Sequence, residues 1–103
     1  MSNWIRACST DDIETEDLIR FDHGERTFAI YRSPNDFFCT DGLCTHENVH
    51  LERGLVMDYI IECPMHNGRF DYRTGEAKRS PACTALGTYP VKVEGGHVFV
   101  DLA

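Results

Sequence analysis

The sequence predicts an all-β protein, built as an antiparallel β-sheet sandwich base with a loop-rich subdomain inserted into it. Short segments in which apolar and polar residues alternate are broken by turn residues about every ten positions. No segment repeats apolar residues with the 3.6-residue period of a helix, so any helix should be short. The 103 residues suit a single domain, and 42% hydrophobic with 26% charged residues is typical of a globular chain.

The first predicted hairpin pairs residues 18–22 with residues 27–32 across the four residues between them. Both segments alternate in polarity, as half-buried strands do. Phe28 and Ile30 should share one face, because side chains two positions apart in a strand point the same way. A further short apolar strand is expected at residues 37–39.

A second hairpin is predicted near the C-terminus, where a Gly-Gly pair at residues 95–96 separates two alternating segments. Both glycines accept positive φ, which a two-residue hairpin turn requires. The alternating apolar residues are Tyr89, Val91, Val93, Val98 and Val100. We therefore expect base strands within about residues 1–40 and 84–103, and an inserted subdomain at about residues 41–83.

The charge balance excludes some partners. Ten Lys and Arg against seventeen Asp and Glu give a formal net charge of -7. Binding to nucleic acid phosphates needs the opposite balance, so a basic patch on another protein is a better match than nucleic acid. No export signal is visible, and the apolar runs are far shorter than the roughly 18 residues of a membrane helix. A cytoplasmic location with no membrane partner is expected.

Two short motifs contain residue types that bind metals. The first is Cys44-x-His46, and the second, after sixteen intervening residues, is Cys63-Pro-x-His66. Each motif places one thiolate and one imidazole on a short loop, so two loops could hold one metal centre between them. Ligand type alone leaves zinc and an iron-sulfur cluster open, although zinc fingers usually pair Cys with Cys and His with His.

These motifs, together with the run HNGRFDYRTG that begins at His66, resemble the Rieske [2Fe-2S] family. Residues 84–101 are similar to the closing strands of that family, and residues 80–82 to its proline loop. The resemblance implies a Rieske-like fold with one [2Fe-2S] cluster, in which Cys44 and Cys63 bind one iron while His46 and His66 bind the other. It also implies cluster surroundings and a small docking surface formed by Val49, Leu51, Met65, Gly68 and Pro81.

The departures from the high-potential members of the family predict a low reduction potential. Val49 and Met65 stand where those members have an extra cysteine pair that forms a disulfide. Gly68 and Phe70 stand where they have Ser and Tyr, so two hydroxyl donors to the cluster are missing. Because hydrogen bonds to the cluster sulfurs raise the potential, we expect a value of about -150 mV, near the low end of the Rieske range.

Low potential and a stand-alone chain resemble the soluble ferredoxins of bacterial aromatic-ring-hydroxylating oxygenase systems. The resemblance implies a monomeric one-electron carrier without catalytic activity of its own. It would accept an electron from a flavin-dependent reductase that uses NADH or NADPH and pass it to a terminal oxygenase. Two alternatives are a small subunit of a reductase such as nitrite reductase and a redox-sensing iron-sulfur protein.

Several remaining residues are interpreted as structural. Cys8, Cys39 and Cys83 are expected to be small buried hydrophobic residues, as unpaired cysteines commonly are. Gly75 should form a turn that needs a residue without a Cβ. Asn67 stands where the family usually has Gly, and Asn tolerates the left-handed backbone region better than most residues do.

Overall fold

The structure is a computed structural model that describes residues 2–45, 48–65, 67–80, 82 and 84–103. Within these ranges the chain forms eleven strands and two three-residue 3-10 helices, so the prediction of an all-β chain with short helices is confirmed. No helix in the described ranges has the length and apolar character that a membrane span requires. The elements are, in order, β1 (Trp4–Ser9), η1 (Thr10–Asp12), β2 (Asp17–His23), β3 (Arg26–Arg32), β4 (Phe37–Asp41), η2 (Leu51–Arg53), β5 (Leu55–Met57), β6 (Ile60–Glu62), β7 (Arg69–Asp71), β8 (Ala77–Arg79), β9 (Thr88–Tyr89), β10 (Val91–Glu94) and β11 (His97–Asp101).

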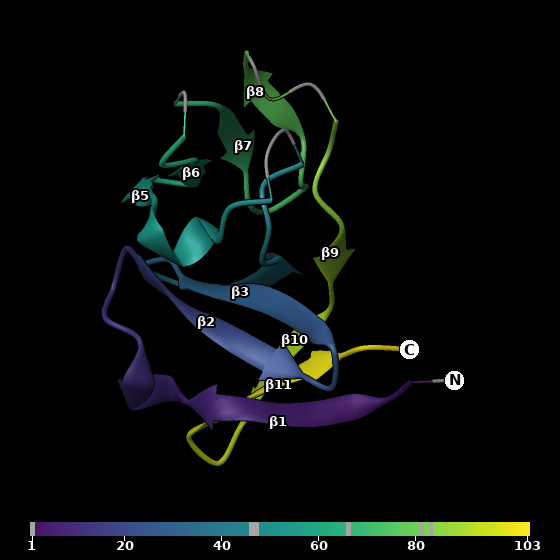
Figure 1. Cartoon of the computed structure of the whole chain (residues 1–103). Coiled ribbons are helices and arrows are strands. Elements are labelled where there is room, and N and C mark those ends of the chain that lie inside the picture. Colours follow the sequence, from purple (N-terminus) through teal and green to yellow (C-terminus); the bar gives the residue numbers. More distant parts are fainter. Residues whose placement is uncertain (1, 46–47, 66, 81, 83) are drawn as a thin grey trace.

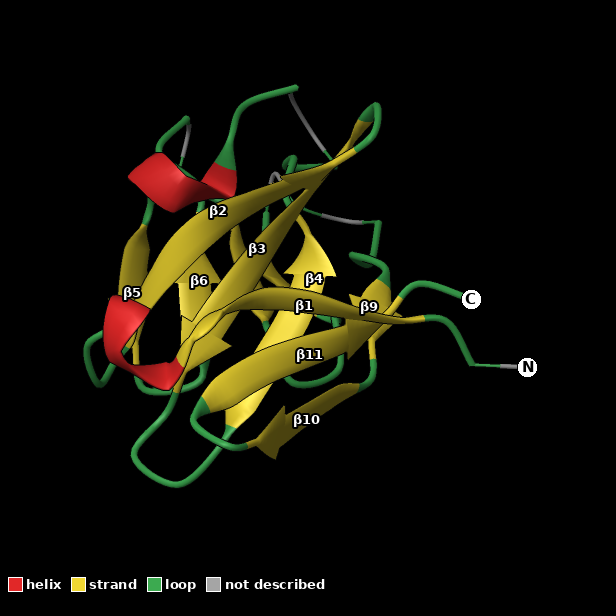
Figure 2. Cartoon of the chain, turned by 90° about the horizontal axis from the view of Figure 1, so that it is seen from below, coloured by secondary structure: helices red, strands yellow, loops and turns green. Residues whose placement is uncertain are grey.

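The strands form three antiparallel sheets. Their strand orders are β1-β11-β10, β2-β3-β4-β9 and β5-β6-β7-β8. Figure 1 shows the sheet of β2 and β3 in the middle, with β1, β10 and β11 on one side of it and β5–β8 on the other. The two termini lie near each other at the edge of the base (Figure 2), where the Leu102 N–H donates to the Asn3 carbonyl at 3.1 Å.

Strand β3 separates two hydrophobic cores. Its alternation places Phe28 and Ile30 in the core between the first two sheets, whereas Ala29 and Tyr31 face the core beneath the third sheet. All four side chains are buried. The strand is therefore buried on both faces and not half-buried, which differs from the prediction for residues 27–32. The shared face predicted for Phe28 and Ile30 is confirmed, and the opposite face of the same strand supports the third sheet.

Both predicted hairpins are present. In the first, His23 pairs with Arg26 across a two-residue turn that begins at Gly24, whose φ is +62°. In the second, Gly95 and Gly96 have φ of +57° and +79°. Two consecutive positive φ values are the geometry of a type I′ turn, whose twist matches that of the paired strands.

The alternating segment before the Gly-Gly pair is not one continuous strand. It divides at Pro90 into β9, which pairs with β4, and β10, which pairs with β11. Proline has no N–H to donate to a sheet, so a strand commonly ends or changes partner there. The change of sheet at Pro90 joins the second sheet of the base to the first.

The third sheet lies in the region that the sequence marks as loop-rich. Each of its four strands has only three residues, and each pairs antiparallel with its neighbour in the chain. Such short strands carry almost no alternation, which is why the sequence pattern does not indicate them. The sheet matters for the candidate site because the loop between β6 and β7 contains Cys63, the first residue of the second motif.

Candidate metal centre

The two motif cysteines begin loops that are closed in the same way. The Cys44 N–H donates to the Val49 carbonyl at 2.9 Å, and the Cys63 N–H donates to the Gly68 carbonyl at 2.7 Å. In both loops the donor and the acceptor are five residues apart. We call residues 44–49 the first cysteine loop and residues 63–68 the second cysteine loop.

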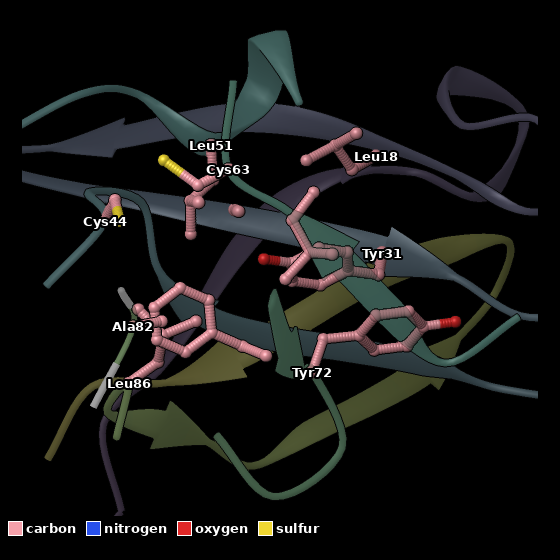
Figure 3. Close-up of a cluster of buried hydrophobic side chains, with 11 residues drawn as sticks. Leu18, Tyr31, Cys44, Leu51, Cys63, Tyr72, Ala82 and Leu86 are labelled. Carbon is pink, nitrogen blue, oxygen red and sulfur yellow. The ribbon is translucent and has the colours of Figure 1, made fainter. Parts of the chain in front are cut away.

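Both cysteine side chains lie in one apolar core. The exposed fraction is 2% for Cys44 and 0% for Cys63, and both belong to the buried cluster that contains Leu51 and Phe70. Figure 3 shows Cys44 and Cys63 toward one end of this core and Tyr72 toward the other. Thiolates are costly in apolar surroundings unless a cation neutralises them, so two buried sulfurs at the ends of matched loops fit a bound metal centre.

The structure describes half of the predicted ligand set. His46 and His66 lie outside the described residues, as does Pro81 of the predicted docking surface. Among the residues that are described, no three His, Cys, Asp or Glu side chains come together as a metal-binding group. Cys44 and Cys63 are thus the two predicted ligands whose positions the structure gives.

The residues predicted as cluster surroundings and docking surface include two that are buried, Leu51 and Gly68. Met65 is 43% exposed and Val49 is half-buried, so both reach the surface of their cysteine loops. Leu51 is fully buried, so it is not part of an exposed docking surface, and its prediction as part of the cluster surroundings stays a prediction. The chain turns inward after the first cysteine loop, where Leu51 begins η2 and packs in the same core as the cysteines.

Gly68 is the last residue of the second cysteine loop, and Phe70 follows it in β7. Neither residue has a hydroxyl group that could donate a hydrogen bond. Phe70 is fully buried in the core that holds both cysteines. A Cβ added at Gly68 would lie 3.1 Å from the Ala82 Cβ, which is a tighter contact than most side chains make.

Asn67 has the backbone conformation that the sequence suggests. Its φ is +59°, inside the left-handed region. Asparagine reaches this region at lower cost than most non-glycine residues. The second cysteine loop therefore keeps its closure without a glycine at this position.

Two residues in or beside the cysteine loops are missed by sequence reasoning. The Thr45 hydroxyl donates to the Thr84 carbonyl at 2.6 Å, across 39 positions of sequence. Leu55, the first residue of β5, is exposed and pairs with Glu62, directly before Cys63. Neither position lies in a recognisable pattern, because each depends on a neighbour that only the folded chain supplies.

Two other cysteines are structural. Cys8 and Cys39 are buried in the core between the first two sheets. Burial raises the pKa of the Cys8 thiol to about 11 and that of the Cys39 thiol to about 12. Both thiols are therefore protonated at neutral pH and poor nucleophiles, as the sequence suggests. Cys83, for which the same role is predicted, lies outside the described residues.

Comparison with known protein families and sequences places these features in context. The family model of the Rieske [2Fe-2S] domain matches residues 3–90. The ferredoxin component of biphenyl 2,3-dioxygenase from Rhodococcus jostii (strain RHA1) is 37% identical to this chain over 97 residues. That alignment covers 94% of this chain and 91% of the relative. The similarity therefore extends over nearly the full length of both proteins.

Solved structures give the same result. A ferredoxin from Sphingomonas yanoikuyae B1 matches with a TM-score of 0.92 and 36% identity, over 98% of this chain and 100% of that one. A chain in the complex of reduced oxygenase and oxidized ferredoxin in carbazole 1,9a-dioxygenase matches with a TM-score of 0.91 and 33% identity. The match covers 95% of this chain and 92% of that one. Both neighbours share the fold and a substantial part of the sequence.

The nitrite reductase alternative receives less support. A putative NADH-dependent nitrite reductase small subunit from Mycobacterium tuberculosis matches with a TM-score of 0.88 but only 17% identity, over 100% of this chain and 97% of that one. At this identity the likeness shows the fold alone. The ferredoxin components are the nearer relatives in sequence.

Proposed function

Because this chain belongs to the Rieske [2Fe-2S] domain family, we propose that it is the ferredoxin component of an aromatic-ring-hydroxylating oxygenase system. It carries one [2Fe-2S] cluster and transfers electrons without catalysing a reaction of its own. The observation that carries this proposal is the near full-length similarity to dioxygenase ferredoxin components, combined with two buried cysteines on matched loops.

Four residues of this chain hold the cluster in the proposal. Cys44 and Cys63 bind one iron, and His46 and His66 bind the other, as in the family. When bound, the cluster accepts and releases one electron. The chain keeps both cysteine sulfurs in an apolar core and closes each loop through the N–H of the cysteine itself.

Two partners belong to the proposal, and the similar ferredoxin found in complex with an oxygenase supports one of them. In the proposal, Met65, which is exposed, forms the docking surface together with Val49 and Pro81. A terminal oxygenase docks there to receive the electron. A flavin-dependent reductase that uses NADH or NADPH supplies it. Weak redox encounters of this kind bury less than about 1,200 Å².

The proposal also covers the location, the oligomeric state and the domain division of this chain. The protein is located in the cytoplasm. It is a monomer, because a shuttle must present one face in turn to two partners. Residues 41–83 form the cluster-binding subdomain, and residues 1–40 and 84–103 form the base. The net charge of -7 favours encounter with basic partner surfaces, so the association rate should fall as salt is added.

The ligand assignment is tested by comparing Cys63→Ala with Cys39→Ala. Both cysteines are buried, but Cys39 lies in the core of the base. Iron and acid-labile sulfide, the visible spectrum and the electron paramagnetic resonance of the dithionite-reduced protein are measured. We expect Cys63→Ala to lose the cluster and Cys39→Ala to keep it. A colourless wild-type protein that contains zinc and no sulfide would contradict the assignment.

The carrier function is tested by electron transfer. The reduced protein is mixed with the terminal oxygenase of a biphenyl or naphthalene dioxygenase system, and reoxidation is followed optically. We expect reoxidation by the oxygenase and rereduction by the reductase with NADH. Substrate turnover by the isolated chain would argue against a carrier, and so would tight copurification with a large catalytic subunit.

A further inference from the structure

The two cysteine loops belong to different parts of the fold, and one segment of the chain contacts both. The second cysteine loop joins β6 to β7, whereas the first follows β4. The segment that contacts both consists of Ala82 and residues 84–89, and we call it the bridging segment. It runs between the third sheet and the base, and it ends in β9.

On the base side, the bridging segment is attached to the start of the first cysteine loop. The Asp41 N–H donates to the Gly87 carbonyl at 2.9 Å, and the Gly87 N–H donates to the Asp41 carboxylate at 3.1 Å. The Tyr89 hydroxyl donates to the other oxygen of the same carboxylate at 2.6 Å. Asp41 is thus held by three hydrogen bonds three residues before Cys44.

On the side of the third sheet, the bridging segment is in close contact with glycines. The Gly68 backbone approaches Ala82 so closely that an added Cβ would lie 3.1 Å from the Ala82 Cβ. The Leu86 N–H donates to the Gly75 carbonyl at 2.8 Å. The same segment is therefore fixed against the second cysteine loop and against the turn that follows β7.

Thr45 completes the attachment on the first cysteine loop itself. Its hydroxyl donates to the Thr84 carbonyl at 2.6 Å, one residue from the Cys44 thiol. The Asp41 contacts lie before the loop, and the Cys44 N–H closes the loop internally. The Thr45 bond therefore ties the body of the first cysteine loop to the element that also holds the second.

We propose that Thr45 is a positioning residue for the cluster. Its hydroxyl fixes the first cysteine loop to the bridging segment, which sets the separation of the two cysteine loops and keeps water from the sulfur ligands. Neither Val49 nor Met65 carries a thiol that could link the two loops covalently. This inference rests on the proposed assignment of Cys44 and Cys63 as ligands.

Thr45→Val tests the proposal, since it replaces the hydroxyl with a methyl group of similar size. The Thr45 side chain is exposed, so the variant is expected to fold. Because the variant lacks one hydrogen bond of ordinary strength, it should lose its cluster to an iron chelator about 2- to 10-fold faster than the wild-type protein. The reduction potential should rise, because water near the sulfurs stabilises the reduced cluster, which is one charge more negative than the formally neutral oxidised one.

Two further variants make the test specific. Thr45→Ser keeps the donor and should restore both the rate of cluster loss and the potential. Thr84→Val is the matched control: Thr84 accepts the bond through its backbone carbonyl, so loss of its side-chain hydroxyl should leave both values unchanged. Far-ultraviolet circular dichroism on every variant confirms that the fold is intact.

The possible failures are distinguishable. If Thr45→Val loses its cluster at the wild-type rate with an unchanged potential, the positioning role is overturned while the proposed function stands. An effect of Thr84→Val equal to that of Thr45→Val would overturn it as well. If Cys63→Ala instead keeps the wild-type spectrum, the ligand assignment itself fails.

Discussion

The aromatic rings of Tyr31 and Tyr72 lie parallel, with their centroids 4.3 Å apart and 3° between their planes. Tyr31 belongs to β3 of the base, and Tyr72 follows β7 of the third sheet. Both side chains are fully buried, and the Tyr72 hydroxyl donates to the Asp58 carbonyl at 2.8 Å. This stack joins the base to the part of the chain that holds the second cysteine loop.

Replacing Tyr31 should therefore destabilise the whole domain. We expect Tyr31→Leu to lower the free energy of unfolding by about 2–4 kcal/mol, because it removes the stacked ring and leaves a cavity. Tyr31→Phe keeps the ring and loses only the hydrogen bond with the Thr40 hydroxyl (2.9 Å), at a cost of about 1 kcal/mol. Urea unfolding measures the stability of both variants. Equal unfolding midpoints for Tyr31→Leu and Tyr31→Phe would contradict a stabilising role of the stacked ring.

Gly75 should be far less replaceable than another glycine of similar φ. Its φ is +81°, and an added Cβ would lie 2.1 Å from the Leu86 carbonyl oxygen. Gly24 has a φ of +62° with no atom within 4 Å of such a Cβ. We expect Gly75→Ala to cost several kcal/mol and Gly24→Ala about 1 kcal/mol. Thermal unfolding compares the two variants. A similar loss of stability in both would contradict the prediction.

Asp71 should make the domain sensitive to acid. Its carboxylate accepts hydrogen bonds from the Arg73 side chain at 2.9 and 3.1 Å and from the Arg73 N–H at 2.9 Å. The Arg73 side-chain hydrogen bonds are the largest cause of a pKa below the usual range for this carboxyl, which is only 9% exposed. A lowered pKa in the folded state stabilises the protein above the unfolded-state pKa of about 4, and this stabilisation is lost as the pH falls through the folded-state value.

The comparison is with Asp71→Asn, which cannot titrate. Chemical unfolding at a series of pH values from 7 down to about 2.5 should show a steeper loss of stability in the wild-type protein than in the variant. The variant should also be less stable at pH 7, because the charged hydrogen bonds are gone. Parallel curves at acid pH would assign the acid sensitivity to other carboxyl groups.

Phe70→Tyr should raise the reduction potential. Phe70 is buried in the same core as Cys44 and Cys63, and a phenol there can donate a hydrogen bond toward the cluster sulfurs. Gly68 is a poorer position for an added hydroxyl, since any Cβ meets Ala82. Potentiometric titration compares the variant with Tyr72→Phe, which loses a phenol bonded to Asp58 and should keep the wild-type potential. An unchanged potential in Phe70→Tyr would contradict the prediction.

Several features of this chain are local, and the sequence alone determined them. The Gly95-Gly96 turn, the alternation of Phe28 and Ile30 and the left-handed tolerance of Asn67 each depend on residues within a few positions of one another. The two cysteine motifs are equally local, because each places its proposed ligands within four residues of one another. Backbone preference and strand periodicity act over such distances, so patterns in the sequence identify them.

Other features depend on packing between distant segments, and only the tertiary structure decided them. The strands of the third sheet are too short to alternate, and Leu51 is buried because the chain turns inward after the first cysteine loop. The bond from Thr45 to Thr84 joins positions that share no sequence pattern. The motifs therefore identify which cysteines can hold a metal centre. The bridging segment determines how the two loops are held, and its contacts form only when the base and the third sheet pack together.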